Sequence, residues 1–262
     1  MKVLIICQVL FLLPLLAWAE LPKLIKVCDD GEEWPPYAYY ERVEGKKSQN
    51  IVGYSVDLLK EIVAAKDIQI SVELIPWSKC LNDLHEGKYD MTLNAGFNSE
   101  RNHSYLMSRA FYTVTPVYFF DNSKKPPLLE SVTDLKKYKL CGVKGYNYRA
   151  GFMLDKNSID LTSTSIMQAF QGIKSGKCDL VPERLEPVVG YKIIKIYDYE
   201  ADGISYRVIP RMEPVTFHMM VSKKISYSKE LFEMINQGIK DLEHSEKNNA
   251  LLKKYSIINS HN

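Results

Sequence analysis

Arg101 is the residue whose chemistry is most specific for a small anionic ligand. It ends a polar segment, Ser99-Glu100-Arg101, that follows the strand-like residues 91–95. A guanidinium stays charged at physiological pH, and its planar set of donors matches both oxygens of a carboxylate. The alternative is an ordinary exposed ion pair with a neighbour such as Glu100, which contributes about 0–1 kcal/mol. The choice depends on which other residues the fold brings to Arg101.

Two tryptophans are candidates to enclose a ligand beside such a carboxylate site. Trp34 precedes two consecutive prolines, and Trp77 follows the alternating segment 68–75. An indole face attracts apolar surface and also cations, the latter by about 0.5–2 kcal/mol. The alternative for each is a tryptophan that belongs to the core or to a loop. The sequence leaves both interpretations open.

The elements that position these residues alternate between strand and helix. Hydrophobic periodicity predicts strands at 24–28, 68–75 and 91–95, and helices at 52–63 and 80–84. This order indicates an α/β domain with a largely parallel sheet, in which ligands bind at the carboxyl ends of the strands. We therefore expect Trp34, Trp77 and Arg101 to meet at one edge of that sheet.

A second α/β unit follows the charged, proline-containing segment 121–127. It has predicted strands at 138–143 and 178–181 and a predicted helix at 165–175, and a glycine-led turn brings in Tyr146 and Asn147. A strand at 215–221 and helices at 229–244 and 248–255 are expected to return to the first unit. The predicted division is a first lobe of residues 20–121 and 215–262 and a second lobe of residues 122–214. Two crossings between lobes would form a hinge.

The N-terminus is typical of a secretory signal peptide. Residues 1–19 contain Lys2, an apolar stretch and Ala17-Trp18-Ala19, which predicts cleavage after Ala19. A retained membrane anchor is the alternative, but the apolar stretch is shorter than the ~20 residues that span a bilayer. No later segment is apolar for long enough to cross one, so we expect an exported, soluble mature protein.

The cysteines and the charge composition limit which classes of protein and which cofactors remain to be considered. Cys7 leaves with the signal peptide, and an even number of cysteines in an oxidising compartment suggests disulfides. Three pairings are possible; a two-lobe fold would favour one bond within each lobe. There is no CxxC pair for zinc and no cofactor motif, so no metal or cofactor is expected. Lys+Arg 34 against Asp+Glu 32 leaves no basic block for nucleic acid. The remaining cysteines are Cys28, Cys80, Cys141 and Cys178.

The mature chain resembles the periplasmic solute-binding proteins of the polar amino-acid type, the bacterial extracellular solute-binding proteins of family 3. No single motif is specific, but their order along almost the whole mature chain is. The resemblance implies a type II periplasmic-binding-protein fold with two lobes, each a mostly parallel sheet flanked by helices. The motifs are Trp34-Pro35-Pro36-Tyr37, Gly53-Tyr54-Ser55-Val56-Asp57-Leu58, Gly87-Lys88-Tyr89-Asp90, Ser99-Glu100-Arg101, Gly142-Val143-Lys144-Gly145, Lys177-Cys178-Asp179-Leu180 and Leu251-Leu252-Lys253-Lys254-Tyr255.

The same resemblance assigns expected roles in ligand binding. It implies that Arg101 binds an α-carboxylate and that Trp34 and Trp77 enclose the ligand side chain. Glu183 is the nearest match for the acid that binds an α-ammonium. An ordinary surface pair of Glu183 with its charged neighbours Arg184 and Glu186 is the alternative. The segment 94–99 is one residue shorter than the common pattern, so Asn94 and Asn98 are candidates without an assigned role.

The glycine-led turn departs from the family pattern. The family places small hydroxyl residues where this chain has Tyr146 and Asn147. The Asn147 amide has donors for a carboxylate, whereas the Tyr146 ring would fill space. The ligand is therefore expected to be smaller than a typical amino acid or of another kind.

The leading functional hypothesis is a periplasmic receptor that closes around a small carboxylate-bearing solute, with an amino acid as the expected ligand, for uptake through an ABC-type permease. We expect a monomer and a binding protein. A ligand sensor for a signalling partner is an alternative use of the same fold. An enzyme resembling the dehydratases on this fold is another, although no recognisable catalytic constellation is present. A scaffold whose cleft no longer binds amino acids is the third.

Overall fold

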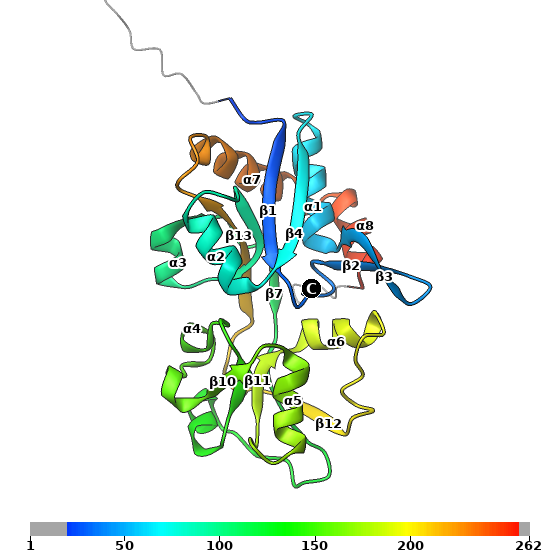
Figure 1. The fold of residues 1–262 in the computed structure, drawn as a ribbon, viewed down its shortest axis with the longest axis vertical. Coiled ribbons are helices and arrows are strands. Elements are labelled where there is room, and N and C mark those ends of the chain that lie inside the picture. The colour runs from blue at the N-terminus through cyan, green and yellow to red at the C-terminus, as the bar shows by residue number, and fades with distance from the viewer. Residues whose placement is uncertain (1–19, 257–262) are drawn as a thin grey trace, which may run out of the picture.

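The computed structural model describes residues 20–256, which form two lobes joined by crossing strands (Figure 1). The predicted signal peptide, residues 1–19, lies outside the described residues. The two lobes agree with the predicted fold class. Within residues 20–256, no helix is both long and apolar enough to cross a membrane.

The first lobe is built on a sheet with strand order β4-β1-β5-β13-β6, and β7 pairs with β13. Strand β1 pairs in parallel with β4 and β5, as predicted, whereas β13 is antiparallel to β5, β6 and β7. The strands are β1 (Leu24–Asp30), β4 (Gln69–Ile75), β5 (Met91–Gly96), β6 (Tyr105–Met107), β7 (Tyr112–Val114) and β13 (Val215–Ser222).

Helices cover both faces of this sheet because its strands alternate two apolar faces. Met219 belongs to a core cluster with residues of α1, α7 and α8, and its neighbour Met220 to a cluster with residues of α2. The C-terminal helices thus return to the first lobe, as expected. The helices are α1 (Tyr54–Ala64), α2 (Trp77–His85), α3 (Ser99–Ser104), α7 (Ser228–Leu242) and α8 (Glu246–Lys254).

The second lobe contains a parallel pair, β9 with β10, and an antiparallel group of order β11-β8-β12. A parallel bridge between Leu140 and Leu180 connects the two groups. The strands are β8 (Pro116–Asp121), β9 (Cys141–Val143), β10 (Asp160–Ser163), β11 (Val181–Arg184) and β12 (Ile204–Val208). The helices are α4 (Tyr148–Phe152), α5 (Ile166–Lys174) and α6 (Leu185–Ile193), with 3-10 turns η1 (Val132–Lys137) and η2 (Lys156–Ser158).

The chain crosses between the lobes at Thr115, which joins β7 to β8, and again between β12 and β13. Because β8 pairs with β11 and β12, it belongs to the second lobe. The expected boundary at residues 121 and 122 therefore lies one strand too late. Glu186 of α6 holds the first crossing, since its carboxylate accepts hydrogen bonds from Thr115 N at 2.8 Å and Thr115 Oγ1 at 2.7 Å.

Each lobe contains one disulfide, as a two-lobe fold favours. Cys28 of β1 is bonded to Cys80 of α2, and Cys141 of β9 to Cys178, which follows α5. The Cα atoms lie 5.7 and 5.8 Å apart, within the usual range for a disulfide. Each bond thus lies within one lobe and joins a strand to a helix in the first lobe and to the loop after a helix in the second.

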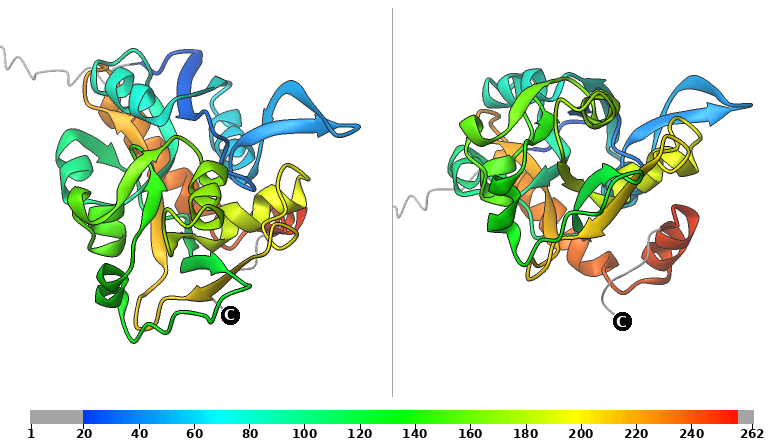
Figure 2. Two further views of the ribbon diagram at one scale, coloured as in Figure 1. Left: turned by 60° about the horizontal axis from the view of Figure 1, so that its bottom comes forward. Right: turned by 90° about the horizontal axis from the view of Figure 1, so that it is seen from below.

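A hairpin that sequence analysis did not predict extends from the first lobe. Its strands are β2 (Tyr39–Val43) and β3 (Lys46–Val52), neither of which has a buried residue, and the hairpin projects away from the lobe (Figure 2). The turn contains Glu44 and Gly45, each with positive φ, a geometry that suits a tight hairpin. The hairpin directly follows the Trp34 loop.

Candidate ligand-binding site

A cavity of about 90 Å³ lies where the two lobes meet. One water needs about 10–15 Å³ on the same measure, so there is room for a small solute. The first lobe contributes the carboxyl ends of β1 and β5, and the second contributes α4 and the end of β11. All of the predicted ligand-binding side chains except Asn98 line the cavity: Trp34, Trp77, Asn94, Arg101, Tyr146, Asn147 and Glu183.

Arg101 reaches the cavity from α3, and Asn98 fixes the start of that helix. The Asn98 side chain accepts a hydrogen bond from Arg101 N at 2.6 Å, so its role is to cap the helix. The Arg101 guanidinium donates to Gly96 O at 2.9 Å and lies 5.4 Å from the Trp77 ring centre. Desolvation lowers the pKa of Arg101 to about 10. No carboxylate of residues 20–256 forms an ion pair with it, so most of its donors remain for a ligand.

Asn94 is part of a hydrogen-bond network beneath the cavity. Its amide nitrogen donates to Asp29 Oδ2 at 2.7 Å, and its oxygen accepts from Ser55 Oγ at 2.6 Å and Tyr112 Oη at 2.9 Å. Burial raises the pKa of Asp29 to about 7 and that of its neighbour Asp30 to about 6. Sequence analysis missed both aspartates, although acids at the end of an apolar strand, on the sheet edge where ligands bind, were a usable signal.

The two tryptophans are largely buried, which makes them part of the core, and they also line the cavity, where a ligand-enclosing role stays a prediction. Trp34 stacks on Phe217 with ring centres 5.7 Å apart, and its Nε1 is buried without a hydrogen-bond acceptor in the described chain. Trp77 is the first residue of α2, which begins three residues earlier than predicted. The helix therefore fixes the indole beside Arg101.

Tyr146 fills space between the lobes, as its size predicts. Its ring meets Trp34 edge-on at 5.9 Å and packs against core clusters of both lobes. Its hydroxyl is buried and has no hydrogen-bond partner among the described residues. Burial, and secondarily the nearby Asp30 carboxylate, raises the pKa of Tyr146 well above its usual value. Asn147 begins α4, where its side chain accepts from Ala150 N at 3.3 Å.

Glu183 and Arg184 are buried at the end of β11, at 2% and 6% exposure, so the alternative of an ordinary surface pair is wrong. Glu183 Oε1 accepts from Arg184 N at 2.8 Å, and Oε2 accepts from Tyr148 Oη at 3.4 Å. Burial raises the pKa of Glu183 to about 7. Arg184 also lines the cavity, but sequence analysis did not assign it there.

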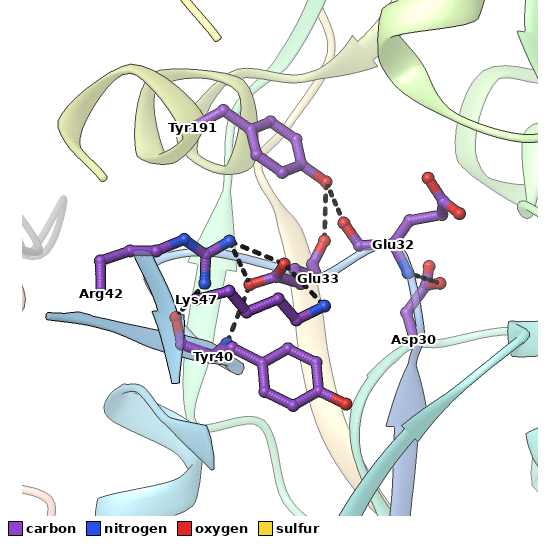
Figure 3. Close-up of polar contacts among 7 residues, drawn as sticks. All are labelled: Asp30, Glu32, Glu33, Tyr40, Arg42, Lys47 and Tyr191. Atoms are coloured by element: carbon purple, nitrogen blue, oxygen red, sulfur yellow. Dashed lines mark hydrogen bonds and ion pairs between the residues drawn. The ribbon is translucent and has the colours of Figure 1, made fainter. Parts of the chain in front are cut away.

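The two lobes also touch directly beside the Trp34 loop (Figure 3). The Tyr191 hydroxyl of α6 lies 2.9 Å from Glu32 O and 2.7 Å from Glu33 O, so it donates to these first-lobe carbonyls. The preceding residue, Gly190, lies so close that a Cβ there would clash with Pro35 O. Helix α6 of the second lobe thus packs against the loop that carries Trp34.

Glu33 ties this loop to the hairpin. Its carboxylate accepts from Arg42 at 2.8 Å and from Tyr40 N at 2.8 Å, and Lys47 lies 3.6 Å away. Glu33 has positive φ, a backbone geometry that these contacts and the Tyr191 hydrogen bond hold in place (Figure 3). The shape of the Trp34 loop therefore depends on residues from β2, β3 and α6.

Comparison with known proteins shows the same architecture. A 122-residue segment is 26% identical to a probable histidine-binding protein of Neisseria gonorrhoeae; it covers 46% of this chain and 42% of that protein. An arginine-, lysine- and histidine-binding protein of Geobacillus stearothermophilus superposes with a TM-score of 0.73 at 19% identity, over 91% of this chain and 97% of that one. An L-arginine-bound amino acid ABC transporter substrate-binding protein of Streptococcus pneumoniae gives 0.71 at 20%, over 89% and 94%.

The family model for bacterial extracellular solute-binding proteins, family 3, matches residues 25–257, which is nearly all of the chain after the predicted signal peptide. This match covers both lobes, both crossings and the residues that line the cavity. The chain belongs to the bacterial extracellular solute-binding proteins of family 3.

Proposed function

We propose that the protein is a receptor that closes its lobes around a small carboxylate-bearing solute, an amino acid or a close relative. The observation that carries this proposal is Arg101, whose guanidinium lines the cavity and has no carboxylate partner within residues 20–256. A ligand carboxylate would supply the missing acceptors, and charge-assisted hydrogen bonds of this kind are among the strongest that proteins form. Trp34 and Trp77 would enclose the rest of the solute.

Closure would follow from contacts that the solute makes with both lobes at once. Arg101 belongs to the first lobe, whereas Glu183 faces the cavity from the second. An ammonium group near Glu183 would favour its ionised form and so lower its pKa. A ligand that binds both lobes stabilises the closed arrangement over the open one by its differential affinity.

Delivery to an ABC-type permease is the use we propose for the closed form. The family membership, and the amino acid ABC transporter binding proteins among the structural neighbours, support uptake over signalling. Export to the periplasm, with cleavage after Ala19, belongs to the same proposal, because an extracellular receptor must cross the inner membrane. N-terminal sequencing of the exported protein tests the cleavage site.

A thermal-shift screen of the mature, oxidised protein against the twenty amino acids and small carboxylates tests ligand binding. A ligand at 100 times its dissociation constant adds about 2.7 kcal/mol, which raises the melting temperature by about 5–10 °C in a protein of this size. Titration calorimetry should then show a loss of about 10- to 100-fold in affinity for Arg101→Gln.

The matched control is Arg109→Gln, because Arg109 pairs with Glu243 on the surface of the same lobe. We expect its affinity to equal that of the native protein. Equal binding by folded Arg101→Gln would contradict the proposed role of Arg101.

One specific observation favours the enzyme alternative, and it concerns Glu183. A buried carboxyl with a pKa of about 7 has the property required of a general acid or base at neutral pH. We still propose a binding protein. NMR spectra of each identified ligand after long incubation with the protein test this point, and formation of product would establish the enzyme.

A further inference from the structure

The charged side chains around the cavity differ in how far the protein already satisfies them. Asp29 accepts from Asp30 N and from Asn94, and both Glu183 oxygens also accept hydrogen bonds. The guanidinium groups are much less engaged. Arg101 makes one hydrogen bond through its guanidinium, and Arg184 Nη1 is buried with no partner at all in the described chain.

Arg184 is held by packing and one hydrogen bond rather than by an ion pair. Its guanidinium lies 4.0 Å from the centre of the Phe152 ring, and Nη2 donates to Gly151 O at 3.4 Å. A Cβ at position 151 would clash with Nη2, so the glycine makes room for the group. The residue is 6% exposed, and within residues 20–256 no carboxylate forms an ion pair with it. The neighbouring Glu183 attracts the Arg184 charge but forms no ion pair with it, and a buried Nη1 without an acceptor is costly. This arrangement is therefore suited to an anion from outside the chain.

We propose that the solute carries two anionic groups, one bound by Arg101 of the first lobe and the other by Arg184 of the second. This inference rests on the proposed function and narrows its ligand to small dicarboxylates, acidic amino acids included. Such a solute connects two cationic side chains that belong to different lobes, and it would therefore favour closure. The limited cavity, with Tyr146 beside it, suits a compact molecule of this class.

Three acids line the same cavity, and each already accepts hydrogen bonds from the chain: Asp29, Asp30 and Glu183. Burial raises the pKa of Asp29 and Glu183 to about 7, so near neutral pH a large share of each carries a proton and repels an anion less. Burial raises the pKa of Asp30 to about 6, so Asp30 is the acid of the three that repels an anion most at neutral pH.

Titration calorimetry with nearly isosteric ligands tests the proposal on the native protein. The pairs are L-glutamate with L-glutamine and L-aspartate with L-asparagine, which differ in the second charge. We expect the acid of at least one pair to bind at least about 10-fold more tightly than its amide. Glutarate and succinate, which lack the ammonium group, distinguish simple dicarboxylates from acidic amino acids.

Arg184→Gln should remove this preference. We expect it to weaken binding of the acid by about 10- to 100-fold and to leave binding of the amide within about threefold. Arg184→Lys should keep part of the preference because the charge remains. Arg149→Gln is the matched control, since Arg149 is an exposed residue of the adjacent helix α4.

The outcomes separate this inference from the proposed function. If acids and amides bind the native protein equally, or if folded Arg184→Gln weakens both equally, the second anionic group is disproved, while a carboxylate receptor that depends on Arg101 stands. If binding survives Arg101→Gln, the proposed function fails instead. The native acid-to-amide ratio decides the matter even if Arg184→Gln does not fold.

Discussion

The two lobes present one arginine each to the cavity but hold it in different ways. In the first lobe, Arg101 extends from α3 and remains partly exposed, while a buried hydrogen-bond network around Asp29 and Asn94 supports the floor of the site. In the second lobe, Arg184 is buried and is fixed by packing on Phe152 and Gly151. Hydrogen bonds thus support the first-lobe half of the site, whereas in the second lobe the close packing of Phe152 and Gly151 adds to the hydrogen bonds of Glu183 and Arg184.

Removing each disulfide should give the largest effect on stability, and it tests whether the two lobes depend equally on their disulfides. The bonds close separations of 52 and 37 residues. The chain-entropy model gives about 4.1 kcal/mol for the first and about 3.8 kcal/mol for the second. We expect the double variants Cys28→Ala/Cys80→Ala and Cys141→Ala/Cys178→Ala to lose nearly equal free energies of unfolding in urea. A loss below about 1 kcal/mol in one lobe would show that the two bonds are not equivalent.

The buried acids predict a pH dependence to which both lobes contribute. Burial raises the pKa of Asp29 from 3.8, and that of Glu183 from 4.5, to about 7. Between about pH 4 and 7 the folded protein therefore holds protons that the unfolded chain has lost. The free energy of unfolding should fall as pH rises through this window and level off above it, by on the order of 3 kcal/mol for each acid.

Urea unfolding at a series of pH values measures this effect. Asp29→Asn should flatten the profile at least as much as Glu183→Gln, because the pKa of Asp29 moves further from its usual value. Asp67→Asn is the control, since Asp67 is exposed and pairs with Lys23. A profile unchanged in Asp29→Asn would mean that the first-lobe network holds an ionised carboxylate.

The smallest expected effect concerns the contact between the lobes. Tyr191→Phe removes the hydroxyl that donates to Glu32 O and Glu33 O. One neutral hydrogen bond contributes about 1 kcal/mol net, so ligand affinity should fall by about 2- to 10-fold with no change in ligand preference. Tyr206→Phe, at an exposed tyrosine, is the control for titration calorimetry. An altered preference would place Tyr191 in the selection of the solute.

Much of the first lobe could be predicted because its elements have clear periodicity. The alternation in β4 and the apolar spacing of α1 identify both elements, and the order of strands and helices brings Trp34, Trp77 and Arg101 to one edge. Strand direction is less visible in a sequence. The antiparallel pairing of β8 depends on partners far along the chain, so the first crossing was misplaced by one strand.

The second half of the site was harder to predict because its charges are buried. Charged residues are usually exposed, which led to the interpretation of Glu183 and Arg184 as a possible surface pair. In the structure β11 continues through Pro182 to Arg184 and carries both side chains into the cavity. The position of the unpartnered Arg184 Nη1 depends on packing against Phe152 and Gly151. No spacing in the sequence indicates that these two residues lie against Arg184.

The direct contacts between the lobes also affect how reliably a permease can distinguish a loaded receptor from an unloaded one. These contacts are made by Tyr146, Tyr191 and Gly190. Their contacts join the lobes through groups that belong to the protein, so they favour the closed shape whether or not a solute is bound. Less free energy is then needed to close the lobes, so more of the free energy of the solute's contacts appears as binding affinity. It also raises the fraction of receptor molecules that are closed with no solute bound. A permease that recognised only the closed shape would then bind some receptors with nothing to deliver.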